Sequence, residues 1–521
     1  MQANTTGELA ELKDILAEVT DLSRAAAVLE WDQETYMPPG GVQSRSEQLT
    51  TLTRLAHVRF ASDEVGSLLQ NLEDELGGRP YDSDEASLIR VTRRDYEEAR
   101  KLPADLVAEV AQAGAVANPV WRQARERENF SLFAPYLEKN VELNRRIADA
   151  LGYEERPYDA LLNRYEPGMK TSDLEAMFEE IKRAIVPLIA DIARNADAVD
   201  DRVLYRGFDS DLQLAYAANL VKRLGYDMER GRQDLSTHPF STAFGPGDVR
   251  ITTRVSRDFF NECLFGSIHE SGHAMYNQGM GANIDRTPLW GGASPGVHES
   301  QSRLWENLVG RSRPFWRHFF PSLHLMFPEP LRDVDEDGFY RAVNRSYPSL
   351  IRVEADEVTY NMHVLLRFEL ENEMLEGALK VNDLPEAWNS RMKSYIGLNV
   401  PNDREGVLQD IHWSSVSFGI FPGYTIGNLV GAQLMEKIRL DIPDLDAQIE
   451  RGDFKPLLGW LRKQVHRHGR KFTPNELLER ATGKPLTAAP WIAYARQKFG
   501  ALYGLIPAKS EPAASFRGGP C

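Results

Sequence analysis

The residues most suited to catalysis lie in one short segment, HESGH at 269–273, where two histidines stand four residues apart. On a helix, residues four apart share a face, so both imidazoles can bind one ion while Glu270 stands beside it. A zinc protease uses such a glutamate to take a proton from the bound water as that water attacks a carbonyl. The spacing predicts a zinc-dependent hydrolase with His269 and His273 as ligands.

The alternative is an ordinary helix that happens to carry two histidines. Phe260, Leu264, Ile268 and Met275 form an apolar stripe beside the histidine row, which predicts a largely buried helix. Buried histidines need polar partners, and a metal supplies them. Gly266 and Gly272 lower helix stability but let another element, or a substrate, approach closely. This context favours the zinc site.

A catalytic zinc ion needs a third protein ligand. Tyr276 and Gly279 occupy the positions where a metzincin has its glycine and its third histidine, so that class is excluded. A second HES, at 298–300, opens a predicted helix with Glu299 in its first turn and Glu306 two turns later on the same face. Asp285, in the intervening loop, is a weaker candidate. Spacing alone does not choose between Glu299 and Glu306, either of which can instead be a solvated or ion-paired carboxylate.

The elements that position these residues are predicted to be mostly helical. Between residues 171 and 196, apolar residues recur at steps of three and four, and Ser172 with Glu175 predicts a capping box at the start of that helix. Strand signals are scarce, and the clearest is the alternating segment DVRITTRV at 248–255. We therefore expect one helical unit over residues 1–506 and a flexible tail over 507–521.

Composition limits the classes of partner. The 521 residues include 61 basic and 77 acidic side chains, and this balance argues against nucleic acid or an anionic membrane. No apolar run reaches membrane-spanning length, and the N-terminus lacks the pattern of a signal peptide. The presence of only two cysteines argues against a disulfide framework. The simplest expectation is a soluble cytoplasmic protein.

Several segments together resemble one family, the M32 metallocarboxypeptidases. They are WDQETYMPPGG at 31–41, HPF at 238–240, DVRIT at 248–252, HESGH at 269–273, HESQSR at 298–303, IRVEAD at 351–356 and GVLQDIHW at 406–413. The resemblance implies an all-α fold with a small β element, similar to neurolysin and angiotensin-converting enzyme, in which two lobes flank a deep active-site groove. It also implies a homodimer, His269, His273 and Glu299 as metal ligands, and Glu270 as general base.

A carboxypeptidase must also hold the free carboxylate of its substrate, and the paired donors of arginine suit this task. The resemblance nominates Arg352 in IRVEAD. The alternative is an ion pair between Arg352 and Asp356, four residues later on one helix.

Hydrolysis further needs donors aimed at the developing oxyanion. His412 and Tyr424 are the candidates, with Gln409 and Asp410 as neighbouring residues that bind substrate or orient these groups. Tyr424 can equally be a core tyrosine near a Pro-Gly turn. The chain departs from the family pattern nearby: members usually show FGYFPTY, whereas this chain has Ile420 and Gly423. This departure predicts a difference in specificity or rate.

Two further segments are candidates for substrate binding. The strand at 248–253 is expected to offer an open edge to an extended peptide, with Arg250 as a contact, although Asp248 and Arg250 can equally form a structural ion pair. His238, followed by Pro239, is expected either to line the groove or to cap a turn.

The leading functional hypothesis is a zinc carboxypeptidase of broad specificity acting on peptides with a free C-terminus, with cobalt able to replace zinc. One alternative is an oligoendopeptidase of the same helical class. The other is a non-catalytic metal-binding scaffold, which would close the fourth coordination position and have no use for Glu270.

Overall fold

The computed structural model describes residues 2–76 and 78–506. Helices make up most of this part of the chain, and three short strands form one sheet. The expected fold class, all-α with a small β element, is confirmed. The tail expected at 507–521 lies outside the described residues.

The first seven helices are α1 (Gln2–Thr35), α2 (Val42–Phe60), α3 (Asp63–Leu76), α4 (Asp84–Lys101), α5 (Ala104–Glu126), α6 (Ala134–Leu151) and α7 (Pro157–Asn163). The next seven are α8 (Thr171–Arg194), α9 (Ser210–Leu224), α10 (Phe260–Gly279), α11 (Pro295–Arg303), α12 (Arg313–Met326), α13 (Pro328–Leu331) and α14 (Glu336–Val343). The last seven are α15 (Tyr360–Glu376), α16 (Leu384–Tyr395), α17 (Pro422–Asp441), α18 (Leu445–Glu450), α19 (Lys455–Gln464), α20 (Pro474–Thr482) and α21 (Ala489–Leu502). The strands are β1 (Gln233–Leu235), β2 (Ser241–Gly245) and β3 (Asp248–Thr253).

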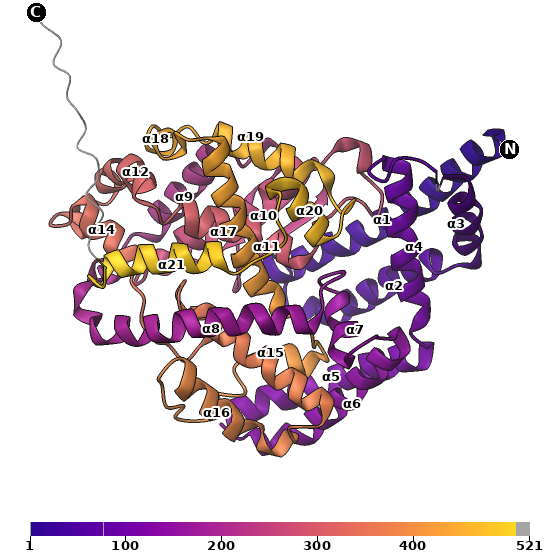
Figure 1. Cartoon of the computed structure of the whole chain (residues 1–521), viewed down its shortest axis with the longest axis horizontal. Coiled ribbons are helices and arrows are strands. Elements are labelled where there is room, and N and C mark those ends of the chain that lie inside the picture. The colour runs from indigo at the N-terminus through magenta and orange to yellow at the C-terminus, as the bar shows by residue number, and fades with distance from the viewer. Residues whose placement is uncertain (1, 77, 507–521) are drawn as a thin grey trace, which may run out of the picture.

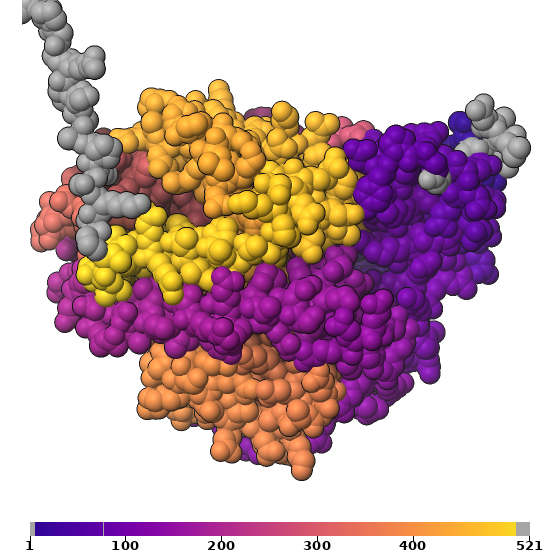
Figure 2. Space-filling model, in the orientation of Figure 1, coloured from indigo at the N-terminus to yellow at the C-terminus, as the bar shows by residue number. Residues whose placement is uncertain are grey.

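Three helices from distant parts of the sequence form the centre of the molecule: α11 packs on both α10 and α17. The long helix α8 runs across the middle of the view in Figure 1, with α21 packed along it. Below α8, the segment containing α15 and α16 projects from the body (Figure 2). Helices α1 to α4 lie together at the side where the chain begins (Figure 1). The central helices carry the residues expected to bind metal.

The apolar side chains form two clusters. The larger cluster contains buried residues from α5 through α21, and the smaller one joins α1, α3 and α4 with Ile284 and Leu289. The stripe predicted on 260–279 belongs to the larger cluster, because Phe260, Leu264 and Ile268 are each no more than 2% exposed. The prediction that this helix is largely buried is therefore confirmed.

The helix predicted after residue 171 is also confirmed, but its capping box is wrong. The helix α8 begins at Thr171, whose backbone N–H and hydroxyl both donate to Asp159 of α7. Glu175 instead forms an ion pair with Arg156. The first turn is capped by a carboxylate from another helix, which removes the need for a local box.

The sheet has the order β1-β3-β2, with β1 parallel and β2 antiparallel to β3. Ile251 of β3 is the register partner of Gln233 on one side and of Ser241 on the other. The expectation that β3 offers an open edge is therefore wrong, because the central strand has its backbone groups paired on both sides. A strand of alternating pattern reads the same at the centre of a small sheet as at its edge.

No helix within residues 2–76 and 78–506 combines the length and the apolar character needed to cross a membrane.

Candidate active site

The predicted metal ligands His269, His273 and Glu299 come together. One ligand atom from each lies within 4.8 Å of the others. Oε2 of Glu299 is 3.5 Å from Nε2 of His269 and 3.3 Å from Nε2 of His273. Two imidazole nitrogens and one carboxylate oxygen are the donor set of a His2Glu catalytic metal site.

Close packing of α10 on α11 creates this geometry, and Gly272 permits it. A Cβ atom added at Gly272 would lie 2.7 Å from both the carbonyl oxygen of Gln301 and the Cα of Ser302. No side chain fits there, so the two helices approach directly and bring the histidines of α10 to the carboxylate of α11. The predicted close approach is confirmed at Gly272 but not at Gly266, where an added Cβ would lie 3.5 Å from Oγ1 of Thr253, an ordinary contact.

Glu299 is held from two further sides. A Cβ at Gly427 of α17 would come within 2.6 Å of the Cγ of Glu299, so the glycine leaves the path of this side chain clear. Nε of Arg303 donates to Oε1 of Glu299 at 2.7 Å. Since Arg303 occupies Oε1, only Oε2 faces the histidines, and the geometry favours a single oxygen ligand. The i,i+4 spacing of Glu299 and Arg303 is the sequence signal that could have found this contact.

Glu306 is not in the metal cluster but contacts it through His269. Its Oε2 lies 2.9 Å from Nδ1 of His269, and Arg303 and Arg311 also bond its carboxylate. Burial alone would raise the pKa of Glu306, but His269 and the arginines lower it to about 2. A π-helical turn, Leu304–Val309, follows α11 and rotates later residues relative to Glu299. Both glutamates contact His269 and Arg303, but Glu299 faces Nε2 of His269 whereas Glu306 faces Nδ1, and only Glu299 also reaches His273.

The electrostatics of the cluster fit a cation. Burial would lower the pKa of His269, but Glu299 and Glu306 together raise it to about 10, so the site stabilises positive charge. An acceptor on Nδ1 also fixes the tautomer in which Nε2 is free to bind metal. The weaker candidate Asp285 forms an ion pair with Arg24 at 2.6 Å and takes no part in the cluster.

Glu270 faces the site from α10 and is 7% exposed. Burial raises the pKa of its carboxyl above the ordinary value. Among the described residues, no group donates a hydrogen bond to this carboxylate. A buried carboxylate free of protein donors, beside two metal ligands, is available to accept a proton.

Arg352 lies in a short 3₁₀ turn, Arg352–Glu354, and is 6% exposed. Its Nη2 is 2.7 Å from Oδ1 of Asp410, and its Nη1 donates to the hydroxyl of Tyr360 at 3.1 Å. The alternative pairing with Asp356 is wrong, because Asp356 accepts hydrogen bonds from Ser346 and from Thr359 just before α15. The segment is a turn, so the i,i+4 geometry of a helix does not apply.

Gln409 and Asp410 hold this arginine in place. The side-chain oxygen of Gln409 accepts the backbone N–H of Arg352 at 2.9 Å. Asp410 also pairs with the fully buried Arg367 at 2.5 Å. Two guanidinium groups therefore share one carboxylate, which leaves one net positive charge. Arg352 retains two unused N–H donors of its five once the bonds to Asp410 and Tyr360 are counted.

His412 and Tyr424 lie beside Arg352. The rings of His412 and Tyr424 are 6.5 Å apart, and Cζ of Arg352 is 5.1 Å from the ring of Tyr424. Burial lowers the pKa of His412 to about 4, and burial raises the pKa of Tyr424 above its usual value. Near neutral pH, His412 is therefore an uncharged imidazole and Tyr424 a protonated phenol, and each can donate one hydrogen bond.

Arg250 and His238 lie elsewhere. Arg250 pairs with Asp248 at 2.8 Å and stacks over the rings of Trp31 and Phe244, none of which is a metal ligand. The structural ion pair weighed from the sequence is thus present. The side chain of His238 is exposed, and its backbone carbonyl accepts a bond from Ser236. Neither residue joins the metal cluster or the arginine cluster.

A pocket of about 430 Å³ opens beside the metal ligands. Its lining residues are His273, Gly292, Ser294, Pro295, His298, Glu299, Ile420, Gly423 and Tyr424. His298 stacks on His273 with ring centres 4.5 Å apart and bonds Asn277 through Nε2. His298 therefore neighbours the metal ligand His273 and lines the pocket.

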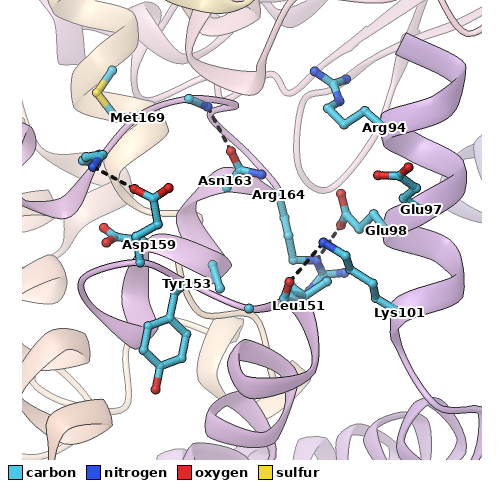
Figure 3. A pocket seen from close by; sticks show the side chains of 15 residues that line it. Arg94, Glu97, Glu98, Lys101, Leu151, Tyr153, Asp159, Asn163, Arg164 and Met169 are labelled. Carbon is cyan, nitrogen blue, oxygen red and sulfur yellow. Dashed lines mark hydrogen bonds and ion pairs between the residues drawn. The ribbon is translucent and has the colours of Figure 1, made fainter. Parts of the chain in front are cut away.

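Glu166 is a residue that the sequence analysis missed. It is fully buried, and its Oε1 accepts the backbone N–H of Gly296, in the first turn of α11, at 2.6 Å. Burial raises its pKa to about 7. Glu166 lies in the loop between α7 and α8, and neighbouring residues of this loop line a surface cavity of about 280 Å³. There the side-chain oxygen of Asn163 accepts the backbone N–H of Gly168 (Figure 3). No local pattern could have linked Glu166 to a helix about 130 residues later.

A model of the carboxypeptidase Taq (M32) metallopeptidase family matches residues 11–499. Thermostable carboxypeptidase 1 of Thermus thermophilus is 42% identical over 503 residues, which cover 95% of this chain and 98% of that protein. Carboxypeptidase 1 of Bacillus subtilis is 37% identical over 493 residues, with coverage of 95% and 98%. The crystal structure of an M32 carboxypeptidase from Deinococcus radiodurans has a TM-score of 0.92 at 43% identity and covers 96% of this chain and 100% of that one.

Proposed function

The chain belongs to the carboxypeptidase Taq (M32) family of metallopeptidases, and on that premise we propose that it releases single residues from peptides with a free C-terminus, with broad specificity and with zinc as its metal. The His2Glu donor set supports zinc, since the same combination serves catalytic zinc elsewhere. The family assignment disfavours the oligoendopeptidase and the non-catalytic scaffold.

The reaction is a hydrolysis in which this chain supplies proton transfer and binding. The metal, when bound by His269, His273 and Glu299, supplies Lewis acidity that activates water and polarises a carbonyl. Glu270 accepts the proton that the attacking water loses and delivers it to the leaving amine. Its raised pKa suits both steps, because the carboxyl can hold a proton between them.

Two donors serve the oxyanion that develops on the scissile carbonyl. His412 and Tyr424 each keep one proton to donate near neutral pH, because burial lowers the pKa of His412 to about 4 and raises the pKa of Tyr424. Neither group is charged, so each acts as a dipole in a buried site, where such a donor is strongest. We assign both of them to stabilisation of the transition state.

The buried charge at Arg352 is the observation that carries the exopeptidase assignment. One aspartate is shared by Arg352 and Arg367, so the cluster has an unbalanced positive charge and two free donors for a terminal carboxylate. Tyr424, which touches this arginine, also lines the pocket of the metal ligands. A carboxylate at Arg352 therefore lies close to the bond that is cut.

A peptide with a free C-terminus and its amidated twin test this assignment. We expect stepwise loss of single residues from the free peptide and little reaction of the amide, measured by mass spectrometry. Equal cleavage of both peptides at internal bonds would overturn the exopeptidase assignment in favour of an oligoendopeptidase.

The identity of the metal, the homodimer and the cytoplasmic location are part of the same proposal. Elemental analysis of protein purified without added metal tests zinc, and reconstitution with cobalt tests the substitute. Light scattering tests the dimer, and cell fractionation tests the location.

A further inference from the structure

Glu371 of α15 is a fully buried carboxylate that accepts hydrogen bonds from three donors. Its Oε1 accepts the indole N–H of Trp413 at 2.8 Å. Its Oε2 accepts the hydroxyl of Tyr158 at 2.8 Å and the backbone N–H of Gly419 at 3.0 Å. An ionised carboxylate only accepts hydrogen bonds, so all three bonds can form together and offset the cost of burying it.

Two of the three donors belong to one segment, residues 412–424. Trp413 directly follows His412, and Gly419 lies five residues before Tyr424, which is in the first turn of α17. The third donor, Tyr158, lies on α7, which packs on α15. Glu371 therefore ties the 412–424 segment at two points to the helices behind it.

The backbone between these two points is strained. Val416 has a φ of 59°, in the left-handed region that a β-branched residue rarely adopts. Such a conformation persists only where the surrounding structure holds it. Glu371 bonds the segment three residues before Val416 and three residues after it. A Cβ at Gly419 would lie 2.9 Å from the backbone carbon of Leu161, so the segment also lies directly against α7.

The same segment carries both groups assigned to the oxyanion. The rings of His412 and Tyr424 pack on Phe421 between them, with ring centres 4.6 Å and 6.4 Å from it. A shift in the path of the segment therefore moves both donors. We propose that Glu371 is a positioning residue that fixes the 412–424 segment and thereby sets where His412 and Tyr424 meet the transition state. This inference rests on the proposed function, which assigns both groups to the oxyanion.

Two substitutions separate positioning from stability. Tyr158→Phe removes the donor on α7 and leaves both bonds to the segment. Glu371→Gln keeps the size of the side chain, but an amide has one accepting oxygen, so in either orientation its NH2 group faces the N–H of Trp413 or of Gly419. Each substitution disturbs a buried hydrogen bond and should lower Tm. Only Glu371→Gln also loosens the segment.

The readout is a comparison of kcat with KM. Burial raises the pKa of Glu371 to about 7, so the assays are run at pH 8, where the carboxylate is the main form. For Glu371→Gln we expect kcat to fall by about 10- to 100-fold with KM nearly unchanged, because the displaced donors act in the transition state. Affinity for a phosphinic peptide, which resembles that state, should fall by the same factor. Tyr158→Phe should match the native protein in both quantities, and metal content should be stoichiometric in both variants.

Native kcat in Glu371→Gln would overturn the proposal. An equal fall of kcat in Tyr158→Phe, or a fall without weaker binding of the phosphinic peptide, would overturn it too. If Glu371→Gln does not fold, Trp413→Phe removes one bond to the segment while the carboxylate stays, and native kcat in that variant would have the same meaning. Absence of residue release from every peptide by the native protein would instead overturn the proposed function, and the phosphinic peptide would still report on Glu371.

Discussion

Glu306 offers the sharpest test of how this site holds its metal, since it touches the ligand His269 and not the metal position. The hydrogen bond between Oε2 of Glu306 and Nδ1 of His269 is 2.9 Å long, and both side chains are less than a fifth exposed. A hydrogen bond to a charged group contributes about 1.5–3 kcal/mol. Loss of such an outer contact weakens metal binding by about 10- to 100-fold. The two magnitudes agree, because each factor of ten corresponds to about 1.4 kcal/mol.

Two substitutions separate geometry from charge. Glu306→Gln keeps an oxygen that can accept the Nδ1 proton but removes the negative charge, and we expect about 10-fold weaker metal binding. Glu306→Ala removes the acceptor as well, and we expect metal binding to weaken by about 100-fold. Metal affinity is measured on metal-free protein by competition with a chromophoric chelator. Thermal unfolding of the metal-free proteins is measured separately, because Glu306→Ala also leaves Arg311 without a carboxylate partner.

Asp285→Asn is the matched control, since it removes a charge from the candidate carboxylate that pairs with Arg24. Its metal affinity should equal that of the native protein. Native affinity in Glu306→Ala would refute the reasoning. Complete loss of binding in that variant, equal to the loss in Glu299→Gln, would refute it too, because Glu306 would then be a ligand.

Three other substitutions give separate tests. Glu270→Gln should keep stoichiometric metal while kcat falls by about 10²- to 10⁴-fold, and full activity would exclude Glu270 as the base. Arg352→Met should lower kcat/KM for free peptides by about 100-fold and abolish discrimination against amides, and retained discrimination would place the anchor elsewhere. Glu166→Gln tests pH dependence. Because burial raises the pKa of Glu166 from 4.5 to about 7, the native state keeps a proton that the unfolded state loses, so stability falls as pH rises through this interval. In the native protein the free energy of unfolding should fall by up to about 3 kcal/mol over this interval, and the variant should not show this fall. The difference in Tm between the two proteins should therefore grow from pH 5 to pH 8. A Tm difference that does not change with pH would contradict this prediction.

The parts of this protein that the sequence determined by itself are those governed by local geometry. The pitch of a helix places His269, Glu270 and His273 on adjoining faces whatever surrounds them, so their grouping follows from spacing alone. The buried stripe of α10 follows from the same periodicity. The resemblance to a known family added Glu299 and Arg352, which spacing could not supply.

Tertiary packing decided the rest, because the relevant contacts join segments far apart in the chain. Glu299 and Glu306 look equivalent along a predicted helix, but the packing of α11 on α10 places them at opposite nitrogens of His269, and only Glu299 also reaches His273. β3 lost its expected open edge because two other strands flank it. Glu166 reaches α11 across about 130 residues. The spacing of residues along one helix says nothing about which distant helix will pack against it, and that packing completes the site.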